Sequence, residues 1–177
     1  MLIGVISDTH SYMDDRALRL LQGVDHILHA GDIGDAGIIE ELQAIAPVTA
    51  VRGNVDREPP TSFYPAEETL ELEDHRIFLT HEVKPPKRET DLALAGYRQS
   101  RVDVVVYGHS HIAYQQRWGG ILFFNPGAAG KRRFKVIPSI GFLTLTLGGV
   151  EGSITPLEAA QESGFPAMPP PFHRSGR

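Results

Sequence analysis

Cysteine is absent from the 177-residue sequence, which excludes disulfides, thiolate metal sites and a cysteine nucleophile. Any metal ligands must therefore be nitrogen or oxygen donors. Long apolar runs are missing too: no stretch approaches the roughly 20 apolar residues of a membrane-spanning helix, and residues 2–6 are too short for a signal-peptide core. These absences lead us to expect a soluble cytoplasmic protein with no membrane partner.

Positive charge is scarce as well, because 17 Lys and Arg face 22 Asp and Glu and the formal net charge is −5. Affinity for long DNA or RNA depends on many Lys and Arg that neutralise backbone phosphates, and no basic or aromatic track runs along this chain. We therefore expect no extended nucleic-acid partner. A small phosphate ester is still compatible with this charge, since bound cations can supply positive charge locally.

The first third of the chain alternates between buried-strand and amphipathic-helix patterns. Strands are predicted at residues 2–6, 25–30 and 48–51, and helices at residues 14–22 and 36–45. Such alternation is typical of a parallel sheet covered by helices.

The pattern changes after Pro60 to short segments with turn signals between them. Strands are predicted at residues 68–72, 76–80, 102–107, 112–118, 121–124, 140–147 and 150–155, with a helix at residues 88–100. We expect these strands to form hairpins in a second sheet. Residues 1–157 are assigned to a single domain, and the proline-rich residues 158–177 are expected to be a flexible tail.

Polar clusters follow five of the predicted strands. They are Asp8-Thr-His10, Gly31-Asp32, Gly53-Asn54-Val55-Asp56, Thr80-His81 and Gly108-His109-Ser110-His111. In α/β sheets, ligands bind beyond the carboxyl ends of the strands, so residues far apart in sequence can converge there. The arrangement predicts a metal-bound active site.

The donor types narrow the choice of metal. If Asp8 and His10 lie on extended chain, their side chains share a face and can hold one cation. Carboxylate together with imidazole suits Mn, Fe, Co, Ni or Zn better than Ca or Mg, and we expect Mn²⁺ first. Asp32 could bridge two ions, with Asn54 as a neutral oxygen donor and His81 as a further imidazole.

Two divalent ions, two carboxylates and one hydroxide leave about one net positive charge, which attracts a phosphodiester monoanion. Two-metal sites lower the pKa of a bound water and hold the attacking and leaving oxygens in line. The predicted reaction is hydrolysis of a small phosphodiester.

Taken in order, Asp-x-His, Gly-Asp-x-x-Asp, Gly-Asn-x-Asp, Thr-His, Gly-His-x-His and Asn125-Pro-Gly127 resemble the calcineurin-like metallophosphoesterases. The resemblance covers about residues 1–147 and is closest to their small bacterial and archaeal phosphodiesterase branch. It implies a four-layer α/β/β/α sandwich with two mixed β-sheets and a dinuclear metal centre.

The resemblance also implies how the ligands divide. One ion would be held by Asp8, His10, Asp32 and His111, and the other by Asp32, Asn54, His81 and His109. Asp32 would be the bridge, Asn54 would also contact the substrate phosphate, and a metal-bridging hydroxide would be the nucleophile.

The chain departs from the family in two places. Val55 stands where many members have a histidine that serves as general acid and is partnered by the residue equivalent to Asp35. Glu82 stands where the family commonly has glycine. Without this histidine we expect a lower rate of hydrolysis rather than a loss of activity, and a preference for diesters over monoesters.

Several alternatives stay open. The family resemblance includes a eukaryotic trafficking subunit that mainly holds partners, so a metal-binding interaction scaffold is the second functional hypothesis, and a homo-oligomer is compatible with either. We expect His29 to be a core residue or to orient a ligand, and Arg52 to pair with Asp56 or Asp8. Lys131-Arg132-Arg133 is either a solvated charge run or a guide for an anionic substrate.

Overall fold

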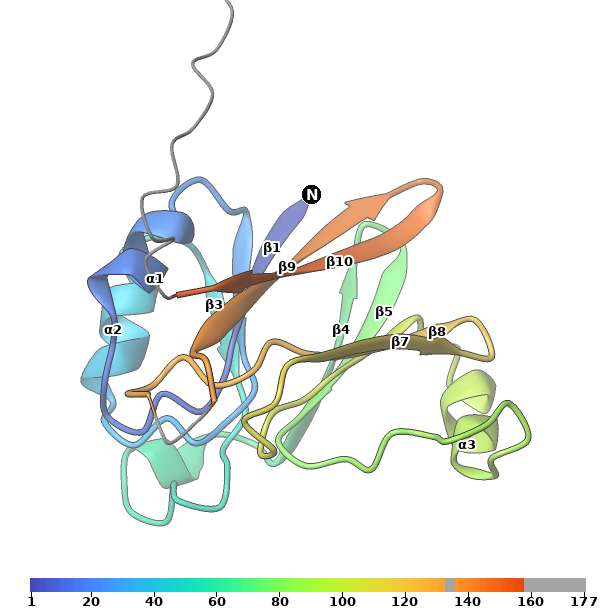
Figure 1. Ribbon diagram of the computed structural model, residues 1–177, viewed down its shortest axis with the longest axis horizontal. Helices are drawn as coiled ribbons and strands as arrows, with labels where there is room; N and C mark the ends of the chain where they lie inside the picture. The colour runs from blue at the N-terminus through green and yellow to red at the C-terminus, as the bar shows by residue number, and fades with distance from the viewer. Residues whose placement is uncertain (133–135, 158–177) are drawn as a thin grey trace, which may run out of the picture.

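The computed structural model describes residues 1–132 and 136–157, in which two five-stranded sheets pack face to face with helices outside them (Figure 1). Both sheets are mixed, so the expected four-layer α/β/β/α sandwich is confirmed. The expected tail, residues 158–177, lies outside the described residues. Within the described residues, no helix is long and apolar enough to cross a membrane.

The first sheet has the strand order β10-β9-β1-β2-β3. Its parallel part consists of β1 (Leu2–Ile6), β2 (His26–His29) and β3 (Val48–Ala50). Its antiparallel part is the hairpin of β9 (Ser139–Thr146) and β10 (Gly149–Pro156), which pairs with β1. We expected this hairpin in the second sheet. Its apolar residues instead complete the core around β1. This pairing joins residues far apart in the sequence, so no local pattern encodes it.

The second sheet has the order β4-β5-β6-β8-β7. Its strands are β4 (Glu67–Leu72), β5 (His75–Thr80), β6 (Val104–Val106), β7 (Tyr114–Trp118) and β8 (Ile121–Asn125). The central strands β5, β6 and β8 run parallel, so the expectation of hairpins alone was wrong for them. Antiparallel pairing is confined to the outer strands β4 and β7.

The helices cover the outer faces. In Figure 1, α1 (Asp15–Leu20) and α2 (Gly37–Gln43) lie beside the first sheet, and α3 (Ala93–Gln99) lies beside the second. A short 3₁₀ helix, η1 (Thr61–Phe63), follows β3. The helix expected at residues 88–100 begins later, because Thr90 and Asp91 favour turns and the preceding bonds are single turns such as Asp91 N–H to Arg88 O.

Three apolar clusters separate the four layers. Val104 and Val106 of β6 point into the cluster between the sheets, whereas Val105 between them points toward Leu94 of α3. This alternation follows from the two-residue period of a strand, and a strand buried on both faces is apolar throughout. At Gly4, a Cβ atom would lie 2.3 Å from Leu21 Cδ2, so glycine allows α1 to pack directly on β1.

Candidate metal centre

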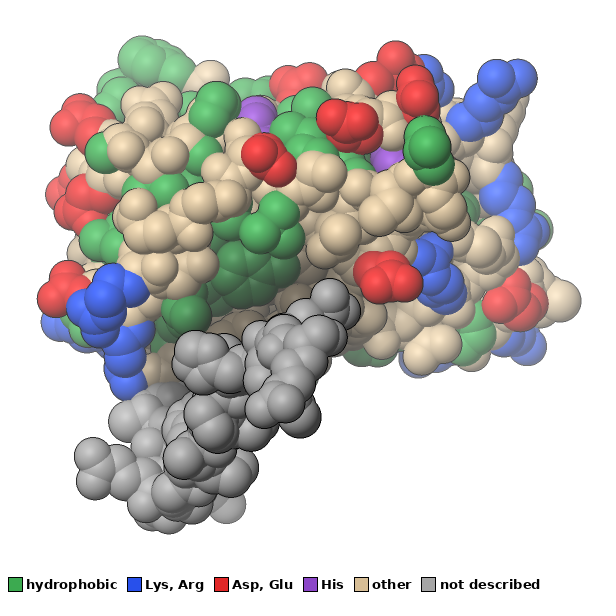
Figure 2. Space-filling view, turned by 90° about the horizontal axis from the view of Figure 1, so that it is seen from above, with side chains coloured by type: hydrophobic (Ala, Val, Ile, Leu, Met, Phe, Trp, Pro, Cys, Tyr) green, Lys and Arg blue, Asp and Glu red, His purple; other side chains and the backbone are tan. Residues whose placement is uncertain are grey.

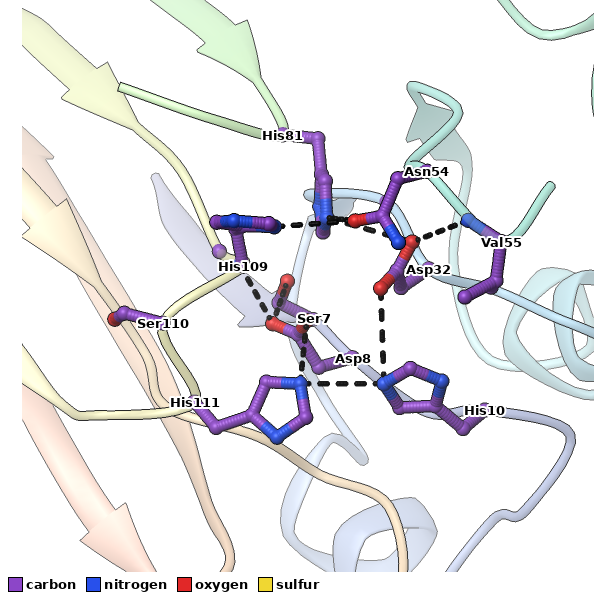
Figure 3. A network of polar contacts seen from close by, with 12 residues as sticks. Ser7, Asp8, His10, Asp32, Asn54, Val55, His81, His109, Ser110 and His111 are labelled. Atoms are coloured by element: carbon purple, nitrogen blue, oxygen red, sulfur yellow. Dashed lines mark hydrogen bonds and ion pairs between the residues drawn. The ribbon is translucent and has the colours of Figure 1, made fainter. Parts of the chain in front are cut away.

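The seven predicted ligands come from loops that follow parallel strands of both sheets. Asp8, Asp32 and Asn54 follow β1, β2 and β3 of the first sheet, while His81 and the His109–His111 loop follow β5 and β6 of the second. Because the two sheets pack with these ends at the same edge, all seven side chains point toward one another (Figure 3).

One group of donors, which we call the Asp8 half, consists of Asp8, His10, Asp32 and His111. One ligand atom from each lies within 4.8 Å of all the others. His111 Nε2 is 3.2 Å from both His10 Nε2 and Asp8 Oδ1. Asp32 Oδ2 lies 3.7 Å from His10 Nε2.

The second group, the His81 half, consists of Asp32, Asn54, His81 and His109. Asn54 Oδ1 lies 3.2 Å from His81 Nε2 and 3.1 Å from His109 Nδ1. Asp32 Oδ1 lies 3.4 Å from His81 Nε2. The two oxygens of Asp32 therefore face different halves.

Asp8 provides a test of whether a cation fits. Its Oδ2 accepts hydrogen bonds from Ser7 Oγ at 2.7 Å and from the His109 N–H at 3.1 Å. Among the described residues its buried Oδ1 has no hydrogen-bond partner, although Nε2 of His111, another predicted ligand, lies 3.2 Å away. A buried carboxylate oxygen without a partner is costly, and a divalent cation among these donors would satisfy it.

His81 is oriented as a metal ligand would be. Its Nδ1 donates to the Ala30 carbonyl at 2.8 Å, so in the neutral ring Nε2 carries a lone pair rather than a proton. That lone pair faces the oxygens of Asn54 and Asp32, which is favourable only with a proton or a cation between them. Burial alone would lower the pKa of His81, but its hydrogen bonds to Asp32 and Ala30 outweigh burial and raise the pKa.

Asp32 is held as an anion. Burial would raise its pKa, but the hydrogen bond with His81 and the Val55 N–H, 3.0 Å from Oδ1, outweigh burial and lower the pKa to about 2. The side chain is therefore ionised at neutral pH and can carry a full negative charge between the two halves.

The ligand loops have an unusual backbone. Asp8, His10, Asp32, His109 and His111 all have φ between 47° and 67°. Non-glycine residues seldom adopt this left-handed conformation, and where they do, surrounding structure must hold them. The premise of an extended Asp8-Thr-His10 segment was therefore wrong. Bonds from His10 N–H to Asp32 O (3.0 Å) and from Ser11 N–H to Ile33 O (2.9 Å) bend this loop and bring its side chains to the centre.

The glycines before three ligands have a steric reason. A Cβ atom at Gly53 would lie 2.1 Å from Asp32 Oδ1, and one at Gly108 would lie 1.9 Å from Ser7 Oγ. At Gly31, where φ is +86°, it would lie 2.7 Å from His81 Nδ1. These loops pass so close to neighbouring side chains that only glycine fits.

Supporting residues that the sequence reasoning missed hold the loops together. Asp56 accepts the N–H groups of Ile33 (3.1 Å), Gly34 (2.8 Å) and Gly53 (2.7 Å), and so joins the loops after β2 and β3. Asn125 Nδ2 donates to the Gly108 carbonyl at 2.8 Å. The sequence feature that could have identified Asp56 and Asn125 as supporting residues is their position in the Gly-Asn-x-Asp and Asn-Pro-Gly motifs.

His29 orients the ligand loops, one of the two roles expected for it. Its Nδ1 accepts the Gly31 N–H at 3.2 Å, and its Nε2 lies 3.0 Å from Thr9 Oγ1, between Asp8 and His10 in the chain. Burial lowers its pKa to about 4, which keeps the ring neutral.

The expected pairing of Arg52 is wrong, because Asp56 is occupied by backbone N–H groups and Arg52 donates to the Tyr64 carbonyl at 2.7 Å.

Asp35 accepts the Gly37 N–H at 2.8 Å at the start of α2. Val55 is exposed, and Glu82 Oε1 lies 3.8 Å from His109 Nε2.

Lys131 and Arg132 line a pocket together with His10 and His111, whereas Arg133 lies outside the described residues. The first two residues of the basic run are thus adjacent to the Asp8 half. Their position favours the substrate-guiding alternative.

Comparisons with known proteins show which family the chain resembles. The family model described as the calcineurin-like phosphoesterase superfamily domain matches residues 1–148. A probable metallophosphoesterase of Methanocaldococcus jannaschii is 39% identical over 137 residues, which cover 72% of this chain and 68% of that protein. A phosphodiesterase of the same organism is 27% identical over 159 residues, covering 81% of this chain and 92% of its own.

Among solved structures, wild-type Vps29 of Entamoeba histolytica in complex with Zn²⁺ has a TM-score of 0.68 and 23% sequence identity. The match covers 89% of this chain and 100% of that chain. At this identity the likeness shows a shared fold.

Proposed function

The chain belongs to the calcineurin-like phosphoesterase superfamily, and from this premise we propose that it is a phosphodiesterase that binds two divalent metal ions and hydrolyses small phosphodiesters. The family expectation from the sequence motifs is thereby confirmed. The number of ions, the preference for diesters and the ligand roles are parts of the proposal.

The arrangement of Asp32 carries the proposal. One oxygen faces His10 in the Asp8 half and the other faces His81 in the His81 half. A carboxylate with its oxygens divided between two donor groups is suited to bridge two cations. The ligands we propose are Asp8, His10, Asp32 and His111 for one ion and Asp32, Asn54, His81 and His109 for the other.

The protein groups prepare the site for a phosphodiester. When bound, the two ions would neutralise the phosphate and activate a water molecule for in-line attack. Asp32 stays ionised and holds the halves together, while Ser7 and the His109 N–H fix the orientation of Asp8. Asn54 places its amide in the His81 half, where its Nδ2 can donate to a phosphate oxygen. The mixed nitrogen and oxygen donors favour Mn²⁺, with Ni²⁺, Fe²⁺, Co²⁺ or Zn²⁺ as alternatives.

The preference for diesters is supported by Val55. Its exposed apolar side chain supplies no proton donor where a histidine would supply one, and Asp35 is engaged at the start of α2. A dianionic monoester would gain most from such a donor, whereas an activated diester needs little protonation of its leaving group. On the face seen in Figure 2, Lys and Arg are dispersed among acidic and other side chains, so this face offers no basic track for an extended nucleic acid.

An interaction scaffold is the second candidate, because the fold is shared with Vps29. The enzyme is favoured by seven convergent donor side chains and by Asp8 Oδ1, which accepts no hydrogen bond among the described residues, since partner binding requires none of them.

The test is to strip the protein of metal, restore Mn²⁺, and measure turnover of bis(p-nitrophenyl) phosphate together with metal content. We expect two ions per chain and turnover only with metal. Asp15→Asn, which removes an exposed carboxylate from α1, is the matched control and should behave as the parent. Two bound ions without turnover of any diester would favour the scaffold, and a protein that binds no metal would overturn the proposal.

A further inference from the structure

The pocket beside the Asp8 half is lined by basic residues as well as by ligands. Lys131 and Arg132 line it together with His10 and His111. A substrate phosphate at the centre would therefore have a positively charged wall beside it. None of the proposed metal or phosphate contacts uses these two side chains.

The loop that carries Lys131 is hydrogen-bonded to the ligand loop after β1, which contains Asp8 and His10. The Ala129 N–H donates to the Ser7 carbonyl at 2.9 Å, and the Gly130 N–H donates to the Asp8 carbonyl at 3.1 Å. A Cβ atom at Gly130 would lie 2.7 Å from the carbonyl oxygens of Asp8 and Thr9, so only glycine allows this approach. The position of the Lys131 backbone next to the centre is therefore set by the same contacts that shape the Asp8 loop.

The Lys131 side chain is held by an aromatic ring. Its Nζ lies 5.3 Å from the centroid of Tyr12, in the range of a cation–π contact. Tyr12 belongs to the ligand loop, because its N–H donates to the Thr9 carbonyl at 3.0 Å. A ring face accepts no hydrogen bond of ordinary strength, so the ammonium keeps donors for an anion.

The opposite side of the centre has the opposite charge. Glu82 is exposed, and its Oε1 lies 3.8 Å from His109 Nε2 in the His81 half. Figure 3 shows His109 and His81 on one side of the centre and His10 and His111 on the other. An anionic substituent would be repelled on the Glu82 side and attracted on the Lys131 side.

We propose that Lys131, held on the Tyr12 ring, forms an anion subsite that takes a second phosphate or similar anionic group carried by one arm of the diester. The inference deepens the proposed function and rests on it. It identifies the substrate class as an asymmetric phosphodiester with one additional anionic group, and it orients that arm toward His10 and His111.

The experiment uses two substrates that differ only in the second phosphate. They are the 5′-p-nitrophenyl ester of thymidine 5′-phosphate and the same compound with a 3′-phosphate. We expect the parent to prefer the 3′-phosphorylated compound by about three-fold in kcat/KM, the scale of one partly exposed ion pair. Lys131→Gln should reduce this preference to about one, and Lys131→Arg should retain it.

Arg101→Gln is the matched control, because Arg101 lies beside the β4–β5 turn residues Glu73 and Asp74, at the end of the second sheet away from His81. It should keep the preference of the parent. No preference in the parent, or a preference that survives Lys131→Gln, would overturn the subsite.

Binding separates this inference from the proposed function. Calorimetry should show that the metal-loaded parent binds thymidine 3′,5′-bisphosphate more tightly than thymidine 5′-phosphate, and that Lys131→Gln removes the difference. If no diester is hydrolysed but this difference is present and depends on Lys131, the subsite is supported and the proposed function fails. Equal binding of both nucleotides by the parent overturns the subsite even when diesters are hydrolysed.

Discussion

The two halves of the candidate centre are unequal in charge and burial. The Asp8 half contains the fully buried carboxylate of Asp8 in addition to the shared Asp32, whereas the His81 half has the neutral amide of Asn54. Its His109 side chain is 43% exposed, compared with 20% for His111 in the Asp8 half. Because charge and low dielectric strengthen cation binding, we expect the Asp8 half to hold its ion more tightly.

The largest effect should come from removing what the halves share. Asp32→Asn takes away the only carboxylate of the His81 half and one of two from the Asp8 half, so both ions should be weakened and diester kcat/KM should fall by several orders of magnitude. Elemental analysis and kinetics check this against Asp15→Asn. Retention of two ions with full turnover would contradict the bridging role.

Removing one ligand from each half, in separate variants, would test whether the two halves hold different ions. His81→Ala should leave one ion per chain, in the Asp8 half, with a loss of affinity for the other of at least 10- to 100-fold. His10→Ala should instead weaken binding of the ion in the Asp8 half. Metal titration followed by calorimetry distinguishes the two variants. If His81→Ala binds two ions as the parent does, His81 has only a structural role.

A smaller effect is expected when a donor is added beside the His81 half. Val55→His keeps the backbone N–H that binds Asp32 and adds an imidazole at an exposed position. Monoester kcat/KM should rise by about ten-fold, below the usual range for general acids because Asp35 is occupied by the Gly37 N–H. Matched aryl monoester and diester substrates provide the measurement, and an equal change for both would show that Val55 does not set the preference.

The smallest effect concerns the free energy of unfolding without metal. The pKa of Asp32 is lowered from 3.8 to about 2, so its contribution is present above about pH 4 and lost as pH falls toward 2. The pKa of His81 is raised above 6.5, so its contribution is complete below pH 6.5 and lost as pH rises through the raised value. The pair should stabilise most between about pH 4 and 6.5, by up to about 2 kcal/mol.

Urea denaturation in the presence of chelator checks this expectation. The difference in the free energy of unfolding between the parent and Asp32→Asn should be largest near pH 5.5 and smaller near pH 3 and pH 9. A difference that does not vary with pH would show that the Asp32–His81 pair does not titrate as described.

Much of the fold was predictable because strand periodicity is local. The strand Leu2–Ile6 was predicted with its bounds, and the others were predicted within a few residues. The partner of the β9–β10 hairpin was not predictable, because pairing with β1 depends on contacts between residues more than 130 positions apart, such as Leu2 and Thr144.

The sequence by itself determined the identity and order of the candidate ligands, since each follows a strand and the motifs around them are short. Only the tertiary structure decided how they meet. The left-handed backbone of the ligand residues, the orientation of each Asp32 oxygen and the placement of Lys131 on Tyr12 all depend on contacts between loops of different strands. Such contacts form only when both sheets pack against each other, so no local pattern in the chain could encode them.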